Sequence, residues 1–208
     1  MLFIKTVEPR TFSILNKLMA IPSLQPFSLV GGTALSLRYG HRSSVDLDLF
    51  YHEKFDHIPI EADLGLEFGS DFDYESGHQK TGIFCYIQKI KVDIVYFPHL
   101  PISEFECEEG IRMYSSNDIA AMKIQAILGR GQKKDFWDLY ELLRHYPLKQ
   151  LIDWHKQKYP SQMLAISIPN AITYFTDADN SDAPVSFKKQ TWEVVKKGIS
   201  RAVSDYLR

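Results

Sequence analysis

The fold is decided by residues 29–50, which read LVGGTALSLRYGHRSSVDLDLF. Turn signals and periodicity predict a short strand, a Gly-Gly turn, a helix of about two turns, a basic loop and a second strand. In the second strand Val45 and every second residue after it are aliphatic, and they alternate with Asp46 and Asp48. Since side chains alternate across a strand, the aliphatic residues should face the core and the carboxylates the opposite side.

Asp46 and Asp48 on one face of a strand indicate a metal site. Neighbouring carboxylates repel each other and resist burial, so the fold gains no stability from them. A divalent cation removes that penalty. Mg²⁺ usually takes one or two carboxylates from the protein and its other ligands from substrate phosphate and water.

The first half of the stretch predicts a phosphate site. Gly31 and Gly32 permit a sharp backbone turn, and Thr33 follows at a helix N-terminus, where free N–H groups attract phosphate. Gly40 is placed to end that helix. Together the two halves predict a nucleotide and metal site. A glycine turn beside a solvated acidic strand is the alternative interpretation, and it explains either half alone.

Gly-Gly-Thr, a helix and Asp-x-Asp on the next strand resemble the polymerase-β-type nucleotidyltransferase superfamily. The string GGTALSLRYGHRSSVDLDLF, residues 31–50, resembles more narrowly the AbiEii/AbiGii toxin-like nucleotidyltransferases of prokaryotes. The resemblance implies a nucleotidyltransferase core with a small mixed sheet, an NTP substrate, and one or two Mg²⁺ ions as cofactor. It also implies a toxin of a toxin–antitoxin system, with a cognate antitoxin as partner.

Composition sets outer limits on function. The chain has 208 residues, 45% of them hydrophobic and 24% charged, which is ordinary for a globular protein. Its formal net charge of −2 gives no general basic field, so any RNA site must be local. Cys85 and Cys107 lack metal-ligand spacing. The sequence shows no signal peptide and no apolar run of about 18 residues, so we expect a cytoplasmic protein without a membrane segment.

A β-hairpin is expected over residues 82–97, with Gln88 and Lys89 at its turn. Its second strand carries Asp93 between Val92 and Ile94. Taken alone, Asp93 could be an acid at a strand edge that faces water. The resemblance implies a further role, because this superfamily places a third carboxylate on a strand next to the Asp-x-Asp pair.

The predicted fold class is α/β (α+β), with a nucleotidyltransferase core over residues 1–114 and a helical region over 115–208 packed on it. Further strands are expected at residues 27–30 and 111–114. Within residues 51–70 one short helix is expected. Other helices are expected at residues 11–20, 118–128, 135–144, 148–158, 163–175 and 186–207. Ser116 or Asn117 could cap the second of these, and Gly129 could end it.

Lys123 lies among the apolar residues of the expected helix 118–128. Such a lysine either extends its charge to the surface or meets an anion. The resemblance implies the second, because a lysine on this helix belongs to the family's active site. Lys134, Asp135 and Asp138 reproduce a family pattern whose first aspartate is proposed to contribute to catalysis. Asp135 also fits the first turn of a helix on dipole grounds alone.

The expected reaction transfers a nucleoside monophosphate from an NTP to an acceptor hydroxyl, and pyrophosphate leaves. Asp46 and Asp48 would hold Mg²⁺, and the Gly-Gly-Thr turn would hold the β- and γ-phosphates. Asp93 would bind a second metal ion or take the acceptor proton. Lys123 would neutralise phosphate charge, and Arg42 could contact phosphate.

The acceptor is expected to be RNA, in particular a tRNA 3′ end, because the resemblance implies it. Two basic features agree: the RGQKK stretch, residues 130–134, and a group of cations in the last helix. That group comprises Lys188, Lys189, Lys196, Lys197 and Arg201. A solvated helix face is the simpler interpretation of the group. Two other functions remain open, a small-molecule (antibiotic-type) nucleotidyltransferase and a non-catalytic nucleotide-binding or interaction module.

Overall fold

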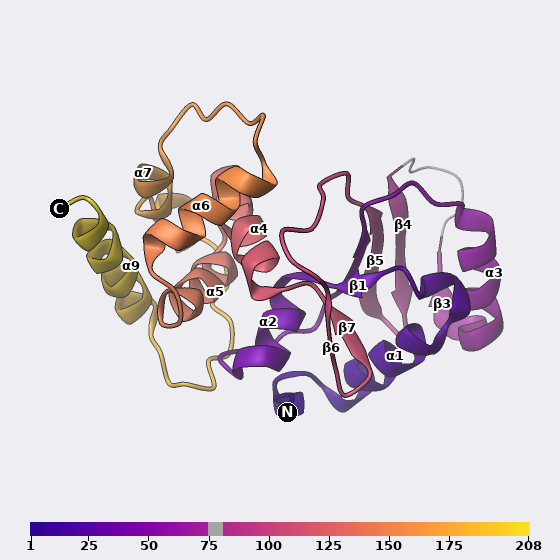
Figure 1. The fold of residues 1–208 in the computed structure, drawn as a ribbon. Coiled ribbons are helices and arrows are strands. Elements are labelled where there is room, and N and C mark those ends of the chain that lie inside the picture. Colours follow the sequence, from indigo (N-terminus) through magenta and orange to yellow (C-terminus); the bar gives the residue numbers. More distant parts are fainter. Residues whose placement is uncertain (75–80) are drawn as a thin grey trace.

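The computed structural model describes residues 1–74 and 81–208. A seven-stranded mixed sheet occupies the first half of the chain, and the named elements from Ser116 onward are helices (Figure 1). The predicted mixed α/β class is therefore confirmed. The division into two domains at residue 114 stays a prediction. Within the described ranges, no helix combines the length and the apolar character that crossing a bilayer requires.

The strands follow the spatial order β3-β4-β5-β2-β1-β7-β6. In chain order they are β1 Ser28–Leu29, β2 Leu47–Tyr51, β3 Phe72–Asp73, β4 Gly82–Ile87, β5 Ile90–Tyr96, β6 Glu106–Glu108 and β7 Ile111–Met113. At the centre of the sheet, β2 pairs with β5 in parallel and with β1 antiparallel. β1 in turn pairs with β7 in parallel. This mixed order brings β2 and β5 together although about forty residues separate them.

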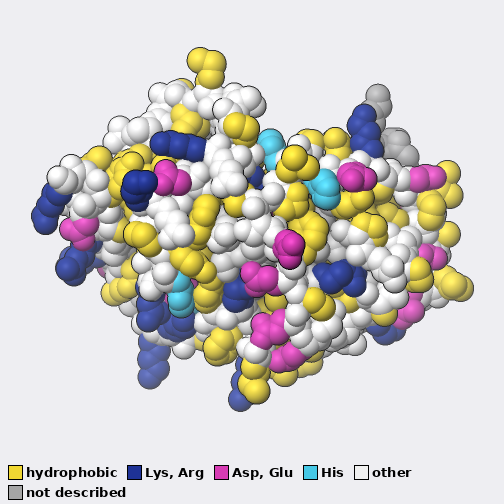
Figure 2. Space-filling view, in the orientation of Figure 1, with side chains coloured by type: hydrophobic (Ala, Val, Ile, Leu, Met, Phe, Trp, Pro, Cys, Tyr) yellow, Lys and Arg dark blue, Asp and Glu magenta, His cyan; other side chains and the backbone are white. Residues whose placement is uncertain are grey.

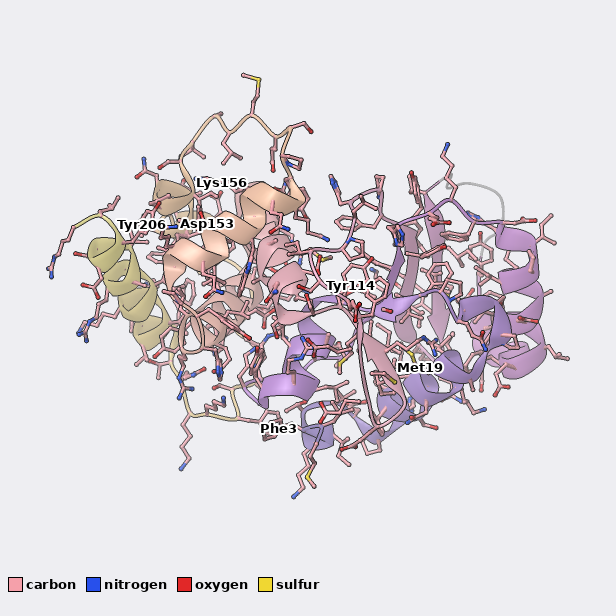
Figure 3. The ribbon with its side chains drawn as sticks, viewed as in Figure 1. Phe3, Met19, Tyr114, Asp153, Lys156 and Tyr206 are labelled. Atoms are coloured by element: carbon pink, nitrogen blue, oxygen red, sulfur yellow. The ribbon has the colours of Figure 1, made fainter. Side chains whose placement is uncertain are left out.

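The helices are α1 Pro9–Ala20, α2 Gly31–Tyr39, α3 His57–Phe68, α4 Ser116–Gly129, α5 Lys133–Leu143, α6 Leu148–Lys158, α7 Ile168–Ile172, α8 Thr176–Asp179 and α9 Trp192–Tyr206. Short 3-10 turns occur at Ile4–Thr6, Pro22–Leu24 and Gly69–Asp71. α1 and α3 lie at the sheet end of the molecule, and α4 lies between the sheet and the group of α5, α6, α7 and α9 (Figure 1). Tyr114, fully buried, lies where the two halves meet (Figure 3).

The register of β2 against β5 sets the two faces of the sheet. Leu49 pairs with Ile94, and both are buried in the core. Asp48 pairs with Asp93 one position earlier, so these carboxylates share the other face. The predicted alternation is confirmed within β2. It is wrong for Val45, which is 49% exposed because the strand begins two residues later.

The hairpin over residues 82–97 is confirmed. Gln88 and Lys89 form its turn with φ values of 50° and 67°, as a tight turn between twisted strands requires. β6 was not predicted. Its sequence carries acidic residues, which strands usually disfavour, and its pairing with β7 supplies the hydrogen bonds.

α4 begins at Ser116, and its N-cap is Ser115 rather than the predicted Ser116 or Asn117. The Ser115 hydroxyl accepts the Asp118 N–H at 3.2 Å. Gly129 is the last helical residue and does not end α4 by itself. The left-handed residue that follows is Gly131, with φ of 52°.

Two helical predictions in the C-terminal half are wrong in extent. Within 163–175 only α7 forms, because the residues before it are exposed and have no core to pack against; Met163 is 96% exposed. Within 186–207 the helix begins only at Trp192. Ser186 instead bridges to Arg42, and Lys189 adopts a left-handed φ of 55°, which a helix excludes. The short helix expected within 51–70 is α3, which has 12 residues.

Candidate active site

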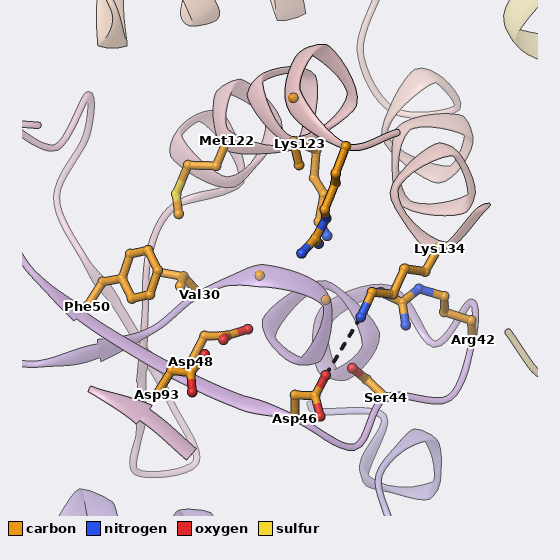
Figure 4. Close-up of a pocket in the computed structure, with 15 residues that line it drawn as sticks. Val30, Arg42, Ser44, Asp46, Asp48, Phe50, Asp93, Met122, Lys123 and Lys134 are labelled. Atoms are coloured by element: carbon orange, nitrogen blue, oxygen red, sulfur yellow. Dashed lines mark ion pairs between the residues drawn. The ribbon is translucent and has the colours of Figure 1, made fainter. Parts of the chain in front are cut away.

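A pocket of about 440 Å³ lies between the sheet and α4 (Figure 4). It brings together most of the side chains that the sequence singles out. Its lining residues are Val30, Gly31, Gly32, Arg42, Ser44, Asp46, Asp48, Phe50, Asp93, Met122, Lys123, Ala126, Gly129, Arg130 and Lys134. Thr33 and Asp135, both predicted site residues, lie outside this lining.

Asp48 on β2 and Asp93 on β5 form the acidic floor of the pocket (Figure 4). Burial and then the charge of the neighbouring Asp93 carboxylate raise the pKa of Asp48 to about 6. One Asp93 oxygen, Oδ1, is buried and has no hydrogen-bond partner among the described residues. Its other oxygen accepts from Lys91. A buried, unpaired carboxylate oxygen needs a cation or a proton donor.

These carboxylates fit a hard divalent cation. In the part of the chain that the structure describes, no three His, Cys, Asp or Glu side chains converge closely enough to hold a metal. Asp46 is drawn toward Lys134, whose Nζ lies 3.7 Å from Asp46 Oδ2. Mg²⁺, however, commonly binds through one or two carboxylates while substrate phosphate and water complete its shell. The adjacent Asp48 and Asp93 meet that requirement.

The glycine turn brings the N-terminus of α2 against this acidic floor. Gly31 has φ of +72°, and a Cβ built on it would lie 2.8 Å from Asp48 Oδ2. A Cβ on Gly32 would lie 2.2 Å from Arg42 Nη2. Glycine is therefore required at both positions, for backbone conformation at the first and for close approach at both. The N-terminal N–H groups of α2 have no intrahelical acceptors, as an anion site requires.

Thr33 supports the site from behind. Its hydroxyl is buried and lies within hydrogen-bond distance of the Asp46 carbonyl, and it also lies 2.8 Å from Ser44 Oγ. These contacts fix the loop that leads into β2. The hydroxyl-bearing residue in the pocket lining is Ser44, which was not among the predicted site residues. Its position just before the Asp-x-Asp strand was the available signal.

Lys123 lies in a buried ion network instead of reaching bulk solvent. Its Nζ is 3.2 Å from Asp135 Oδ1 and 2.7 Å from Asp138 Oδ2. Arg130 Nε lies 3.0 Å from Asp135 Oδ2. Burial alone would raise the pKa of Asp135, but Lys123 and Arg130 outweigh it and the pKa lies below its ordinary value.

Asp138 holds the network together. Arg42 donates to it through Nε at 2.6 Å and Nη2 at 2.8 Å, and His41 Nε2 lies 2.7 Å from the same carboxylate. Burial opposes ionisation, yet Arg42, Lys123 and His41 hold the pKa of Asp138 well below its usual range. The network therefore joins the loop after α2 to α4 and α5. Asp138 was predicted as part of the family pattern, but its ion-pair partners were not, because they lie far from it in the sequence.

The profile of a family described as "Nucleotidyl transferase AbiEii toxin, Type IV TA system" matches residues 13–205. The chain belongs to the AbiEii nucleotidyltransferase toxin family. It is therefore an enzyme of the nucleotidyltransferase class, as the motif resemblance predicted. Membership of a toxin–antitoxin family also implies a nucleotide substrate and a cognate antitoxin.

Three relatives of this AbiEii chain are similar to it in sequence or in fold. The uncharacterized protein aq_aa25 of Aquifex aeolicus is 35% identical over 199 residues, which are 93% of this chain and 94% of that protein. The structure of JHP933 from Helicobacter pylori has a TM-score of 0.57 at 19% identity, covering 95% of this chain and 92% of that one. MenT4, a nucleotidyltransferase toxin of Mycobacterium tuberculosis, has a TM-score of 0.57 at 13% identity, covering 93% and 82%. The two structures show a shared fold.

Proposed function

We propose that this AbiEii-family enzyme transfers a nucleoside monophosphate from an NTP to an acceptor hydroxyl in the pocket between the sheet and α4. One observation carries the proposal. Asp48 and Asp93 lie side by side on β2 and β5, within reach of the glycine turn and opposite four cationic side chains. Carboxylates for a metal ion and cations for phosphate within one pocket are what nucleotidyl transfer needs.

The triphosphate would bind at the α2 end of the pocket. N–H groups of Gly31 and Gly32 and the Ser44 hydroxyl would donate to its oxygens. Lys134 and Arg130, which are 38% and 54% exposed, have freedom to adjust to the β- and γ-phosphates. Anchored in their ion network, Lys123 and Arg42 would add fixed positive charge at little cost in reorganisation.

Asp48, Asp93 and Asp46 would hold Mg²⁺, with one or two ions in the site. When bound, Mg²⁺ neutralises phosphate charge and stabilises the attacking and leaving oxygens. The same carboxylates also keep the pocket negative toward an approaching acceptor. A phosphate ligand can therefore enter only where the cationic side chains offset that charge.

In the reaction, the acceptor oxygen forms a bond to the α-phosphorus. The bond from that phosphorus to the bridging oxygen breaks, and pyrophosphate leaves with the electron pair. Asp93 takes the acceptor proton where it does not bind a second metal ion. Lys134 and Arg130 stabilise the charge that builds on the leaving pyrophosphate.

Labelled NTPs test this proposal directly. Each α-labelled NTP is incubated with the protein, Mg²⁺ and total RNA, and both label transfer and pyrophosphate release are measured. We expect transfer from at least one NTP and none from Asp48→Asn. Asp153→Asn, on an exposed face of α6, is the matched control and should act as the wild type does. Absence of pyrophosphate release with every NTP and acceptor would overturn the proposal.

We further propose RNA, in particular a tRNA 3′ end, as the acceptor and the cytoplasm as the place of action. Family membership favours a nucleic-acid acceptor, and Arg130 and Lys134 are exposed cations at the pocket. Lys133 does not contribute to this surface, because its Nζ donates to the carbonyls of Asp179 and Ser181. Fewer cations of the RGQKK stretch are therefore available to an acceptor than its sequence indicates.

A further inference from the structure

The two walls of the pocket change character along their length. On the sheet side, Asp46 and Asp48 are followed on the same face by Phe50. On the helix side, Arg130 and the small Ala126 give way to Met122. Figure 4 shows Phe50, Met122 and Val30 grouped together, away from Arg42, Ser44 and Lys134. The pocket thus has a cationic end, an acidic middle and an apolar end.

The sheet side and the helix side of the pocket have similar lengths. The stretch from Asp46, just before β2, to Phe50 within it spans about 13 Å if it is extended throughout. Eight residues of helix from Met122 to Arg130 span about 12 Å. A ligand lying along the pocket therefore passes from charged to apolar side chains on both sides. Such a ligand carries anionic groups at one end and a flat apolar group at the other.

We infer that the apolar end, formed by Val30, Phe50 and Met122, is the subsite for the nucleobase of the bound NTP. The inference rests on the proposed function and adds to it the position of the base. With β- and γ-phosphates at the cationic end and the α-phosphate beside Asp48 and Asp93, the nucleoside extends toward Phe50. A nucleobase offers a π-face that stacks on an aromatic ring or packs on a thioether.

The Phe50 ring is placed to receive a base. It is only partly buried, and it packs against the Phe97 ring with centroids 5.2 Å apart and planes inclined by 42°. This contact fixes one side of Phe50 and leaves the side toward the pocket for a ligand. Met122 precedes Lys123 on α4, so the residue that meets the base is one position from the fixed cation.

Selectivity follows from the same residues. Among the described residues that form the apolar end, no side chain offers a hydrogen-bond donor or acceptor to a base edge. Discrimination between bases would then depend on stacking area and not on a hydrogen-bond pattern. We expect purine and pyrimidine NTPs to differ more in affinity than two NTPs of the same class.

Binding measurements without any acceptor test the inference. Calorimetry compares the affinity of wild type, Phe50→Ala, Phe50→Trp and Met122→Ala for an NTP and for inorganic tripolyphosphate, with Mg²⁺ present. Phe50→Ala should weaken NTP binding by about 10- to 100-fold, because one stacking contact is lost, and leave tripolyphosphate binding within about twofold. Phe50→Trp should keep or tighten NTP binding. Tyr174→Ala, at a 54% exposed aromatic residue, is the matched control and should change neither affinity.

Three results would overturn the inference. Phe50→Ala could bind NTP like the wild type, in which case the base lies elsewhere. It could weaken tripolyphosphate as much as NTP, in which case the ring has a structural role. In a separate transfer assay with Phe50→Ala, the KM for the acceptor could rise while the NTP affinity stays that of the wild type, which would assign the apolar end to the acceptor. If wild type binds neither NTP nor tripolyphosphate, the proposed function itself fails, and this outcome differs from the other three.

Discussion

At the residue scale, the proposed site depends on the Asp48 carboxylate, whose ionised form is disfavoured by its surroundings. Burial, followed by the charge of Asp93, raises the pKa of Asp48 to about 6. Lys123 and Lys91 lower it and Asp46 raises it, so no single neighbour compensates for the burial. Without a metal ion, the ionised Asp48 therefore destabilises the folded protein. Sites built for a ligand commonly show this conflict between stability and function.

Asp48→Asn should remove transfer activity and stabilise the metal-free protein. Loss of a carboxylate at the reacting phosphate should cost about a thousandfold or more in kcat. One pKa unit corresponds to about 1.4 kcal/mol, so a rise from 3.8 to about 6 lowers the free energy of unfolding at pH 7 by up to about 3 kcal/mol. Thermal melts with a chelator measure the gain. A melting temperature well below that of the wild type would indicate a structural role instead.

The same carboxylate gives a pH dependence with a definite sign. The folded-state pKa lies above the unfolded value, so the folded protein binds the proton more tightly. The stability contributed by protonated Asp48 is complete below pH 3.8 and is lost as pH rises to about 6. Metal-free wild type should therefore lose stability relative to Asp48→Asn over this range. Denaturant melts at several pH values check the difference, and a constant difference across the range would contradict it.

Lys123→Met should weaken nucleotide binding and also lower stability. Lys123 is buried between Asp135 and Asp138, so its loss leaves two buried carboxylates with fewer partners. Arg130 and Arg42 still hold these carboxylates, which limits the cost to about 2–4 kcal/mol. Denaturant unfolding measures the cost, and calorimetry with a non-hydrolysable NTP measures affinity. Lys17→Met, an exposed lysine paired with Glu67, is the control and should cost less than about 1 kcal/mol. Unchanged nucleotide affinity would remove Lys123 from the phosphate site.

The residues that sequence reasoning could identify are those whose signal is local. Asp46 and Asp48 stand out because charge alternates with aliphatic residues inside one strand. The network around Asp138 has no such signal, since His41 and Arg42 lie almost a hundred residues before it. Pairing over that separation depends on how α5 packs against the loop after α2. The stability cost expected for Lys123→Met likewise became visible only with its partners.

At the element scale, the glycine turn is the part of the chain with the least freedom to change. Gly31→Ala should lower the free energy of unfolding by about 1–3 kcal/mol, because φ is +72° and the new Cβ meets Asp48 Oδ2 at 2.8 Å. It should also weaken Mg²⁺-dependent NTP binding by displacing Asp48. Chemical denaturation and calorimetry measure the two effects.

Gly65→Ala provides the matched control for the glycine substitution. Gly65 lies inside α3, and a Cβ there has nothing within 4 Å. Alanine should stabilise that helix by about 0.5–1 kcal/mol and leave nucleotide binding unchanged. If Gly31→Ala behaved like Gly65→Ala in both measurements, the close approach of the turn to Asp48 would not matter for the site.

Helices and strands whose sequence pattern lies entirely within the element could be predicted. The β4–β5 hairpin has strand-forming residues on both sides of a two-residue turn, and α6 has the predicted bounds of 148–158. α9 begins after the predicted residue because the backbone of residues 185–187 pairs with the loop after α2. Phe187 N–H donates to the His41 carbonyl at 3.0 Å, and Ser43 N–H donates to the Val185 carbonyl at 2.9 Å. A helical pattern cannot reveal that a distant loop will take these backbone groups.

At the scale of the whole molecule, charge is distributed without a dominant sign. Basic and acidic side chains are interspersed over the face drawn in Figure 2, in agreement with the net charge of −2. The predicted basic face of the last helix is partly neutralised: Lys188 Nζ lies 2.6 Å from Glu141 Oε1, and Lys196 Nζ lies 2.8 Å from Glu193 Oε1. An RNA acceptor would therefore be held near the pocket and not across the C-terminal half.

This distribution predicts how RNA binding responds to salt and to single lysines. Lys134 lines the pocket, whereas Lys197 is exposed on α9. Removal of one phosphate contact lowers the magnitude of the slope of log Kobs against log salt by about 0.7–0.9. Lys134→Ala should therefore weaken tRNA binding and flatten this slope, while Lys197→Ala should match the wild type in both.

The measurement is tRNA binding by wild type and both variants at several salt concentrations, without NTP. Equal slopes for Lys134→Ala and wild type, with Lys197→Ala flatter, would move the RNA contact to α9. No binding by wild type even at low salt would exclude RNA as the acceptor class and favour a small molecule. Because the pocket is the same in either case, NTP binding and pyrophosphate release then decide whether the nucleotide half of the site still holds. Under the proposed function, Lys134 at the pocket would contact the acceptor, and the carboxylates, the glycine turn and the other cations of the pocket would carry out the transfer.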